Sequence, residues 1–85
     1  MSKVVIYTST ICWYCQQAKA LLNKKGIPYQ EVNLDQHPEL RDEVVTRSGG
    51  RRTVPQIFVG ERALGGYDEV KALDDAGDLD GILGL

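Results

Sequence analysis

Both cysteines of this 85-residue chain lie in one short motif, Cys12-Trp13-Tyr14-Cys15, between a β-rich segment and a helical one. Such a junction places the thiols at helical positions i and i+3, where they can close a small disulfide ring and open it again. The first sulfur then lies at the helix N-terminus, where free amide N–H groups and the helix dipole favour a negative charge. The motif therefore predicts a redox-active pair with Cys12 as the nucleophilic thiolate.

A cysteine pair also occurs in zinc sites and in structural disulfides. Zinc usually needs four ligands, and beyond the cysteines the chain offers only His37, with no second histidine or cysteine at finger spacing. A disulfide that closes so short a loop removes little entropy from the unfolded chain. Both uses explain the motif less well than catalysis does.

Length and charge narrow the class of protein further. Residues 1–85 suffice for one domain with a modest hydrophobic core. The net charge is −2 and the basic residues are scattered apart from Arg51-Arg52, which argues against a nucleic-acid surface. The chain starts almost directly in a predicted strand, without a signal peptide, and no apolar span is long enough to cross a membrane. We therefore expect a cytoplasmic protein, in a compartment where a C-x-x-C pair is more often catalytic than structural.

Hydrophobic periodicity and turn residues predict the order β, α, β, α, β-hairpin, α. The predicted strands span residues 4–8, 27–33, 56–59 and 62–64, with Gly60-Glu61 as a hairpin turn. The predicted helices span residues 15–25, run from Pro38 to the glycines at 49–50, and follow Gly65-Gly66, with a short closing helix around 79–83. The first strand, helix and strand predict a parallel βαβ unit. This order is that of the thioredoxin fold, an α/β fold with a small mixed four-stranded sheet and helices on both faces.

Three motifs resemble those of one enzyme family, in the right order and at the right spacing. They are the cysteine motif after Val5-Ile6-Tyr7-Thr8, the run TVPQIF at 53–58, and the run GGYDE at 65–69. Over nearly its whole length the chain is similar to dithiol glutaredoxins of the short bacterial type. The resemblance implies a glutathione-disulfide oxidoreductase that reduces protein disulfides and glutathione mixed disulfides. It also implies that Cys15 is the resolving thiol, that glutathione is the co-substrate, and that no metal or organic cofactor is needed.

The TVPQIF run provides a backbone for ligand pairing. A residue before proline is pushed to extended geometry, which leaves the Val54 backbone, after Thr53, able to pair with a peptide such as glutathione. The resemblance implies that the Val54-Pro55 bond is cis and faces the cysteines. The alternative is an ordinary proline at the start of a strand.

The GGYDE run lies at the start of a predicted helix. The resemblance implies that the γ-glutamyl end of glutathione binds here, its carboxylate to backbone N–H groups near Tyr67 and Asp68 and its ammonium to the Asp68 carboxylate. Gly65 and Gly66 would let the ligand approach the backbone closely. The alternative for Asp68 is a helix N-cap, and the two roles are compatible.

Tyr14 and two arginines complete the expected glutathione site. Tyr14 lines the groove in the resemblance, although an aromatic residue there also packs on its own helix. Arg51 and Arg52 precede Thr53, and one of them is a candidate for the glycyl carboxylate, because a guanidinium matches carboxylate geometry. We assign this role to Arg52, and the alternative for both arginines is a solvated loop charge.

Three residues depart from the family pattern. Trp13 stands where proline is most common, Ser9 where lysine is common, and Tyr67 where a smaller residue is usual. Ser9 removes a cation that would stabilise the Cys12 thiolate and hold a ligand carboxylate. We expect the Trp13 ring to stay partly exposed and to contact the substrate beside the scissile disulfide. The alternative is that the ring packs against the body of the protein.

Two other functions remain open for this fold. One is a redoxin that serves ribonucleotide reductase and is reduced by thioredoxin reductase, against which the ligand site around Asp68 argues. The other is a carrier of a [2Fe–2S] cluster held between two subunits by the first cysteine of each and two glutathiones, since some glutaredoxins that lack the active-site proline do this. As an oxidoreductase the protein is expected to act as a monomer.

Overall fold

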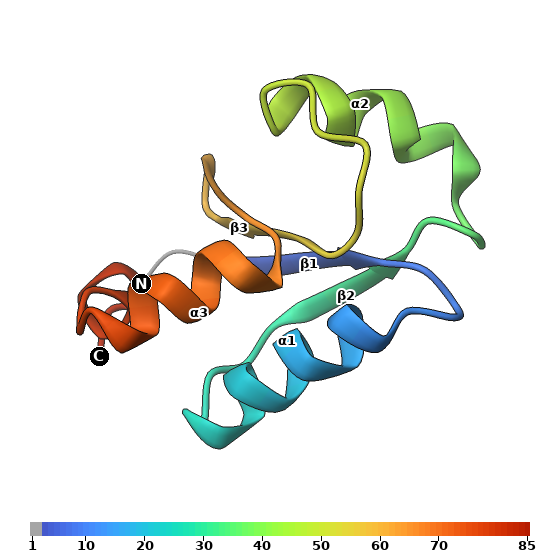
Figure 1. Cartoon of the computed structure of the whole chain (residues 1–85). Coiled ribbons are helices and arrows are strands. Elements are labelled where there is room, and N and C mark those ends of the chain that lie inside the picture. The colour runs from blue at the N-terminus through green and yellow to red at the C-terminus, as the bar shows by residue number, and fades with distance from the viewer. Residues whose placement is uncertain (1–2) are drawn as a thin grey trace.

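The computed structural model describes residues 3–85 (Figure 1). Within them, the strands and helices follow the predicted order. The strands are β1 (Val4–Thr8), β2 (Gln30–Asn33), β3 (Gln56–Val59) and β4 (Arg62–Gly65). The helices are α1 (Trp13–Lys24), α2 (Arg41–Arg47), α3 (Tyr67–Asp75) and α4 (Leu79–Leu83), and a 3-10 turn, η1 (Pro38–Leu40), precedes α2.

The strands form the predicted mixed four-stranded sheet, and their order in it is β2-β1-β3-β4. β1 pairs in parallel with β2, so α1 is the crossover helix of a βαβ unit, and β1 pairs antiparallel with β3. In the hairpin of β3 and β4, Val59 pairs with Arg62 across the turn residues Gly60 and Glu61. Gly60 has a φ of 59°, a conformation that suits glycine at the first turn position. β1 is thus an inner strand, and the residues after Thr8 emerge at one end of the sheet.

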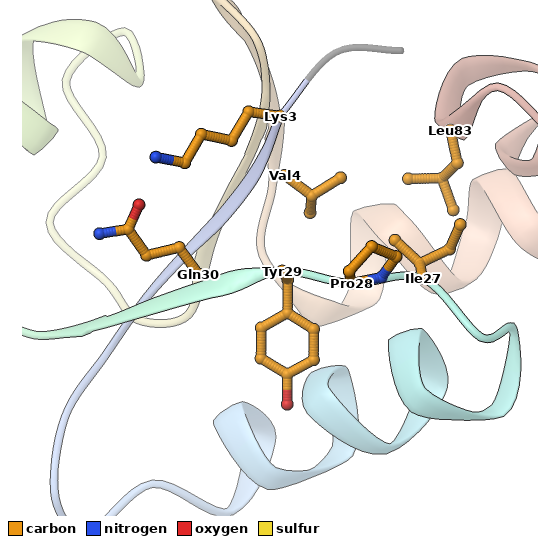
Figure 2. A pocket seen from close by; sticks show the side chains of 7 residues that line it. All are labelled: Lys3, Val4, Ile27, Pro28, Tyr29, Gln30 and Leu83. Carbon is orange, nitrogen blue, oxygen red and sulfur yellow. The ribbon is translucent and has the colours of Figure 1, made fainter.

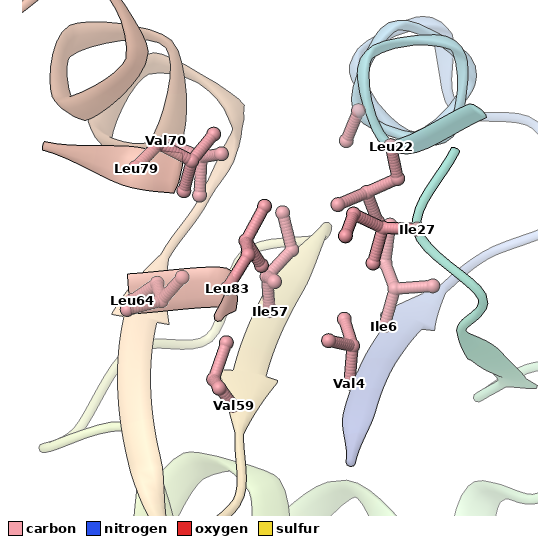
Figure 3. Packing of buried hydrophobic residues seen from close by; sticks show 11 residues of the cluster. Val4, Ile6, Leu22, Ile27, Ile57, Val59, Leu64, Val70, Leu79 and Leu83 are labelled. Carbon is pink, nitrogen blue, oxygen red and sulfur yellow. The ribbon is translucent and has the colours of Figure 1, made fainter. Parts of the chain in front are cut away.

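Helices cover both faces of this sheet, as predicted (Figure 1). Successive side chains of β1 point to opposite faces, so Ile6 and Tyr7 belong to different hydrophobic clusters. The larger cluster lies between the sheet and helices α1, α3 and α4 (Figure 3) and contains Val4, Ile6, Ala18, Leu22, Ile27, Ile57, Val59, Leu64, Val70, Leu79 and Leu83. The smaller cluster lies on the face of α2 and contains Tyr7, Leu34, Val44 and Phe58.

Helix α1 begins at Trp13, two residues before the predicted start at residue 15. Its N-cap is Cys12, whose Sγ accepts the backbone N–H of Cys15 at 3.0 Å. The sulfur thereby satisfies one of the free donors of the first turn, a role that serine, threonine, aspartate or asparagine usually fills. The expected place of the Cys12 sulfur at the helix N-terminus is thus confirmed, and only the range drawn from the apolar residues begins two residues too late.

The second strand and the second helix also differ from the prediction. β2 begins at Gln30 rather than at Ile27. The amide of Ile27 donates to the carbonyl of Leu22 at 3.0 Å and closes the end of α1, and Pro28 has no N–H to offer a sheet. The predicted second helix is divided into η1, which starts at Pro38, and α2.

Candidate active site

The two cysteines lie at the start of α1, just after β1. They are joined by a disulfide, with 5.2 Å between their Cα atoms. Cys15 is fully buried, with 0% of its surface exposed, whereas Cys12 is partly exposed. The first turn of α1 contains no acidic residue, so the helix dipole and the Cys15 amide act on Cys12 without an opposing charge in that turn. Because Cys12 is partly exposed, solvent reaches its sulfur. Once the disulfide is reduced, the helix dipole and the Cys15 amide favour the thiolate form of Cys12.

The loop before β3 faces this sulfur. The Val54-Pro55 bond is cis, which confirms the prediction. Cys12 Sγ lies 3.8 Å from the Val54 carbonyl oxygen. The backbone of Val54 is thus beside the reacting atom, where a ligand joined to Cys12 has to pass.

Gln56 supports that loop from inside the protein, a residue that the sequence analysis did not select. It is 1% exposed, and its Nε2 donates to the Thr53 carbonyl oxygen at 3.0 Å and to the Thr53 Oγ1 at 3.3 Å. Its Oε1 has no hydrogen-bond partner among the described residues. The side-chain amide therefore ties the segment that presents Val54 to the first residue of β3.

A cavity of about 260 Å³ adjoins the loop and the start of α3. Seven of the expected site residues line it, and they come from α1, the loop before β3 and the start of α3. Its lining comprises Tyr14, Arg51, Thr53, Val54, Pro55, Gly66, Tyr67, Asp68 and Glu69. The cavity thus brings positive, negative and aromatic side chains together beside Cys12, and we refer to it as the groove.

Comparisons with known proteins agree with this geometry. A family model described as glutaredoxin matches residues 4–64. The chain is 51% identical to a glutaredoxin of Pseudomonas aeruginosa over 83 residues, covering 98% of both chains. It is 48% identical to glutaredoxin 3 of Escherichia coli strain K12 over 83 residues, covering 98% of this chain and 99% of the relative. The chain belongs to the glutaredoxin family. The likeness to glutaredoxin 3 also confirms the short bacterial type.

Solved structures confirm the thioredoxin-like fold. A buckwheat glutaredoxin–glutathione complex aligns with a TM-score of 0.89 at 31% identity, covering 98% of this chain and 77% of that chain. The solution structure of a glutaredoxin from Brucella melitensis aligns with a TM-score of 0.84 at 49% identity, covering 98% and 89%. With its cysteine pair at the start of α1, this glutaredoxin is a thiol–disulfide oxidoreductase.

The arginine of the glutaredoxin groove is Arg51. Arg52, which the sequence analysis assigned to the glycyl carboxylate, is exposed and does not line the groove, whereas Arg51 does. Alternate residues of an extended segment share a side, and this rule would have grouped Arg51 with Thr53. Arg51 is ion-paired with Glu69, a groove residue that the sequence analysis did not select.

The charge of Glu69 is set by its neighbours. Partial burial raises the pKa of Glu69, but the hydrogen bond from Arg51 and the backbone N–H groups of Gly66 and of Glu69 itself outweigh it. The pKa of Glu69 therefore lies below the usual value for glutamate. Glu69 is therefore ionised at neutral pH, and its charge is paired with that of Arg51.

Asp68 lines the groove but does not cap α3. The N-cap is Gly66, with φ −90° and ψ −165°, and no side chain makes a capping hydrogen bond there. The alternative role of Asp68 as N-cap is therefore wrong, because the helix starts two residues earlier than that role requires. Gly66 is closely packed, since a Cβ there would lie 3.3 Å from the Pro55 carbonyl oxygen.

Aromatic rings form a row from the groove past the cysteines. The rings of Tyr67 and Tyr14 are 6.1 Å apart, and those of Tyr14 and Trp13 are 5.2 Å apart in an edge-on contact. Trp13 is 66% exposed and Tyr14 49% exposed. The expected exposure of Trp13 is confirmed, while its contact with substrate stays a prediction.

A larger cavity, of about 390 Å³, lies at the other end of β1 (Figure 2). It is lined by Lys3, Val4, Ile27, Pro28, Tyr29, Gln30 and Leu83. Neither cysteine borders it. Within residues 3–85 no three histidine, cysteine, aspartate or glutamate side chains gather as a metal site, and no helix there is long and apolar enough to cross a membrane.

Proposed function

We propose that this glutaredoxin is a glutathione-dependent oxidoreductase that reduces glutathione mixed disulfides and protein disulfides. The proposal includes a single domain over residues 1–85 that acts as a monomer in the cytoplasm. One observation carries it: the accessible sulfur, Cys12 Sγ, lies 3.8 Å from the Val54 carbonyl oxygen, and Val54 lines a groove with charges of both signs. Glutathione is a peptide with two carboxylates and one ammonium group, and it needs such a site.

The groove offers a partner for each polar part of glutathione. The Val54 backbone pairs with the cysteinyl residue of the ligand. Backbone N–H groups at the start of α3 hold the γ-glutamyl carboxylate, since Gly66 lets the ligand approach, and Asp68 holds the ammonium group. Arg51 turns from Glu69 to the glycyl carboxylate. Tyr14 and Tyr67 cover the aliphatic parts of the ligand.

Reduction of a mixed disulfide takes two exchange steps. The Cys12 thiolate attacks the glutathione sulfur, the S–S bond to the substrate breaks, and the substrate leaves as a thiolate that takes a proton from water. A second glutathione thiolate then attacks the glutathione sulfur bound to Cys12. This step releases glutathione disulfide and regenerates the Cys12 thiolate.

Protein disulfides use the second cysteine. Cys12 attacks one substrate sulfur and forms a mixed disulfide with the protein, and Cys15 then attacks the Cys12 sulfur. The substrate leaves as a dithiol and the Cys12–Cys15 disulfide forms, which two glutathiones reduce. The short separation of the cysteines, 5.2 Å between Cα atoms, suits this intramolecular step. We propose that both reactions proceed without a metal or an organic cofactor.

The experiment is a comparison of two reducing systems. We expect the protein to turn over a glutathione mixed disulfide with glutathione, glutathione reductase and NADPH, and to be reduced poorly by thioredoxin reductase and NADPH. The opposite result would support the thioredoxin-reductase-linked redoxin, a class that includes donors to ribonucleotide reductase.

The cluster carrier is a second candidate because Trp13 replaces the usual proline. Poplar glutaredoxin C1, a neighbour with a TM-score of 0.89 at 32% identity, is known in a holo form. In this chain Cys12 would be the ligand, since Cys15 is buried. After anaerobic reconstitution with iron, sulfide and glutathione, a brown protein of dimer size would support the carrier, and a colourless monomer would support the enzyme.

A further inference from the structure

Two large apolar side chains flank the reactive sulfur in the chain and face solvent. Ile11 is 95% exposed and Trp13 is 66% exposed. The described chain has four exposed large hydrophobic residues. Ile11, Trp13 and Tyr14 lie within two residues of Cys12, and the fourth is Leu85 at the C-terminus. Single exposed apolar residues are common, but a group around a reacting atom indicates contact with a partner.

The loop that carries Ile11 is anchored. The Thr10 amide donates to Asp35 Oδ2 at 2.8 Å, and Asn33 Nδ2 donates to Thr10 Oγ1 at 3.2 Å. Asp35 is itself bound by Arg41 at 2.8 Å. The hydrogen bond from the Thr10 backbone outweighs burial and holds the pKa of Asp35 below its usual value, so the anchor is charged at neutral pH. Ile11 is therefore presented to solvent from a fixed point.

Trp13 extends the aromatic row beyond the groove. Its ring contacts Tyr14, which lines the groove together with Tyr67, but Trp13 itself does not line the groove. A glutathionyl group bound in the groove uses Tyr14 and Tyr67. Trp13 remains free for the other half of the disulfide, the part that leaves when Cys12 attacks.

The segment around the cysteines carries no charge. Residues 4–18 contain no aspartate, glutamate, lysine, arginine or histidine, although 26% of the chain is charged. The charges that border this segment come from other segments: Arg51, Asp68 and Glu69 line the groove together with Tyr14, and Asp35, paired with Arg41, holds the Thr10 amide. A partner that contacts Ile11 and Trp13 therefore gains by burying apolar surface and meets no charge on this segment.

We propose that Ile11 and Trp13 form a docking surface for the polypeptide half of the substrate disulfide. The preferred substrate is a protein segment with an apolar or aromatic residue next to the reacting cysteine. This inference rests on the proposed glutathione-dependent function and names its substrate class. It requires no new chemistry, because the polypeptide thiolate is the leaving group of the first exchange step.

The test uses two glutathionylated peptides of equal length and charge, one with leucine on both sides of its cysteine and one with serine. The measured quantity is the ratio of their kcat/KM values in the glutathione reductase assay. We expect wild-type protein to prefer the leucine peptide, and this preference to fall about fivefold in Trp13→Ser and in Ile11→Ser. A general effect on folding or on the Cys12 thiolate would change both peptides alike and leave the ratio constant.

Leu85→Ser is the matched control, since Leu85 is 62% exposed but distant in the chain from Cys12. We expect it to keep the wild-type ratio. Equal use of both peptides by wild type, or an unchanged ratio in both flanking variants, would overturn the docking surface and leave the proposed function intact. No turnover of either peptide with glutathione would overturn the proposed function, and the docking surface with it.

Discussion

The two ends of the central strand β1 carry cavities of different kinds. The far cavity, of about 390 Å³, is lined mainly by apolar side chains such as Ile27 and Leu83 (Figure 2). The groove at the other end is smaller, about 260 Å³, but it holds the charges of Arg51, Asp68 and Glu69 and adjoins Cys12 through Val54. Apolar pockets with a few polar groups are the usual ligand sites, and of these two cavities the far one is the larger and the more apolar. The comparison shows that convergence of polar groups on a reactive atom identifies this site better than volume does.

The largest expected effect is at the reactive atom itself. We expect Cys12→Ser to abolish the reduction of both glutathione mixed disulfides and protein disulfides, because no other sulfur is accessible in the described chain. Cys15→Ser should retain most activity on mixed disulfides and lose most activity on protein disulfides. Parallel assays with both substrate types check this, and activity of Cys12→Ser on either one would contradict the assignment.

The far cavity should matter for stability rather than for catalysis. Leu83 is 3% exposed and belongs to the larger hydrophobic cluster, so Leu83→Ala should lower the free energy of unfolding by about 2–5 kcal/mol. We expect kcat/KM per folded molecule to be retained. Urea unfolding measures the free energy of unfolding. A titration of active enzyme gives the concentration of folded molecules, by which kcat/KM is corrected. A specific loss of turnover in the folded fraction would mean that the far cavity takes part in function.

Removal of a charge in the groove should impair catalysis and leave stability unchanged, the reverse of Leu83→Ala. Asp68→Asn removes the partner proposed for the ligand ammonium, and we expect it to weaken glutathione use by about 1.5–3 kcal/mol in kcat/KM. Because Asp68 is exposed and does not cap α3, the free energy of unfolding should change little. Steady-state kinetics with varied glutathione measure the effect. Normal kinetics in Asp68→Asn would remove Asp68 from the proposed binding site.

Loss of the Gln56 side chain, which supports the loop before β3, should have a moderate effect on substrate binding. Gln56→Leu removes the hydrogen bonds to Thr53 that hold the Val54 segment, and we expect the KM for the mixed disulfide to rise about two- to tenfold. The free energy of unfolding should change little, since an apolar side chain of similar shape also removes the unpaired Oε1 from the interior. A fall in stability with an unchanged KM would indicate a purely structural role.

The smallest expected effect concerns the ion pair across the groove. Glu69→Gln frees Arg51 for a ligand carboxylate, and we expect the KM for glutathione to fall by at most about fivefold, the scale of an exposed pair. A higher KM in Glu69→Gln would mean that Glu69 helps to bind the ligand.

The same pair predicts a dependence on pH. Since the pKa of Glu69 is lower in the folded protein than in the unfolded chain, where it is about 4.3, the pair stabilises the fold above that value. This stability is lost as the pH falls through the lower pKa of the folded state. The melting temperature of wild type should therefore drop more on acidification than that of Glu69→Gln.

Local patterns predict the fold well where one residue decides the conformation. A run of β-branched and aromatic residues predicts β1, and Gly60 predicts the hairpin turn, while the resemblance to glutaredoxins implies the cis bond at Pro55. The place of the Cys12 sulfur at the start of α1 is predicted correctly, and only the range drawn from the apolar pattern begins later, at residue 15. The start of α3 directly after Gly65-Gly66 is also predicted, and only the alternative role of Asp68 as N-cap is wrong, because Gly66 caps the helix without a side chain.

The groove is harder to predict because its contacts join distant parts of the chain. Tyr14, Thr53 and Asp68 follow from the family motifs and do meet in the groove. The pairing of Arg51 with Glu69 depends on how the loop before β3 packs over α3, and nothing local in the sequence records it. Gln56 is missed for a related reason: its side chain points into the protein, so exposure and charge do not mark it.

Both ends of the described chain lie away from the cysteines. Lys3 and Leu83 line the same cavity, whereas Cys12 follows the opposite end of β1 (Figure 1). A tether on either end, such as a fused fluorescent protein or a link to a solid support, would leave the sulfur facing open solution. The domain is therefore suited to being anchored at a chosen place, and its electron transfer would then be confined to disulfides within the reach of that tether.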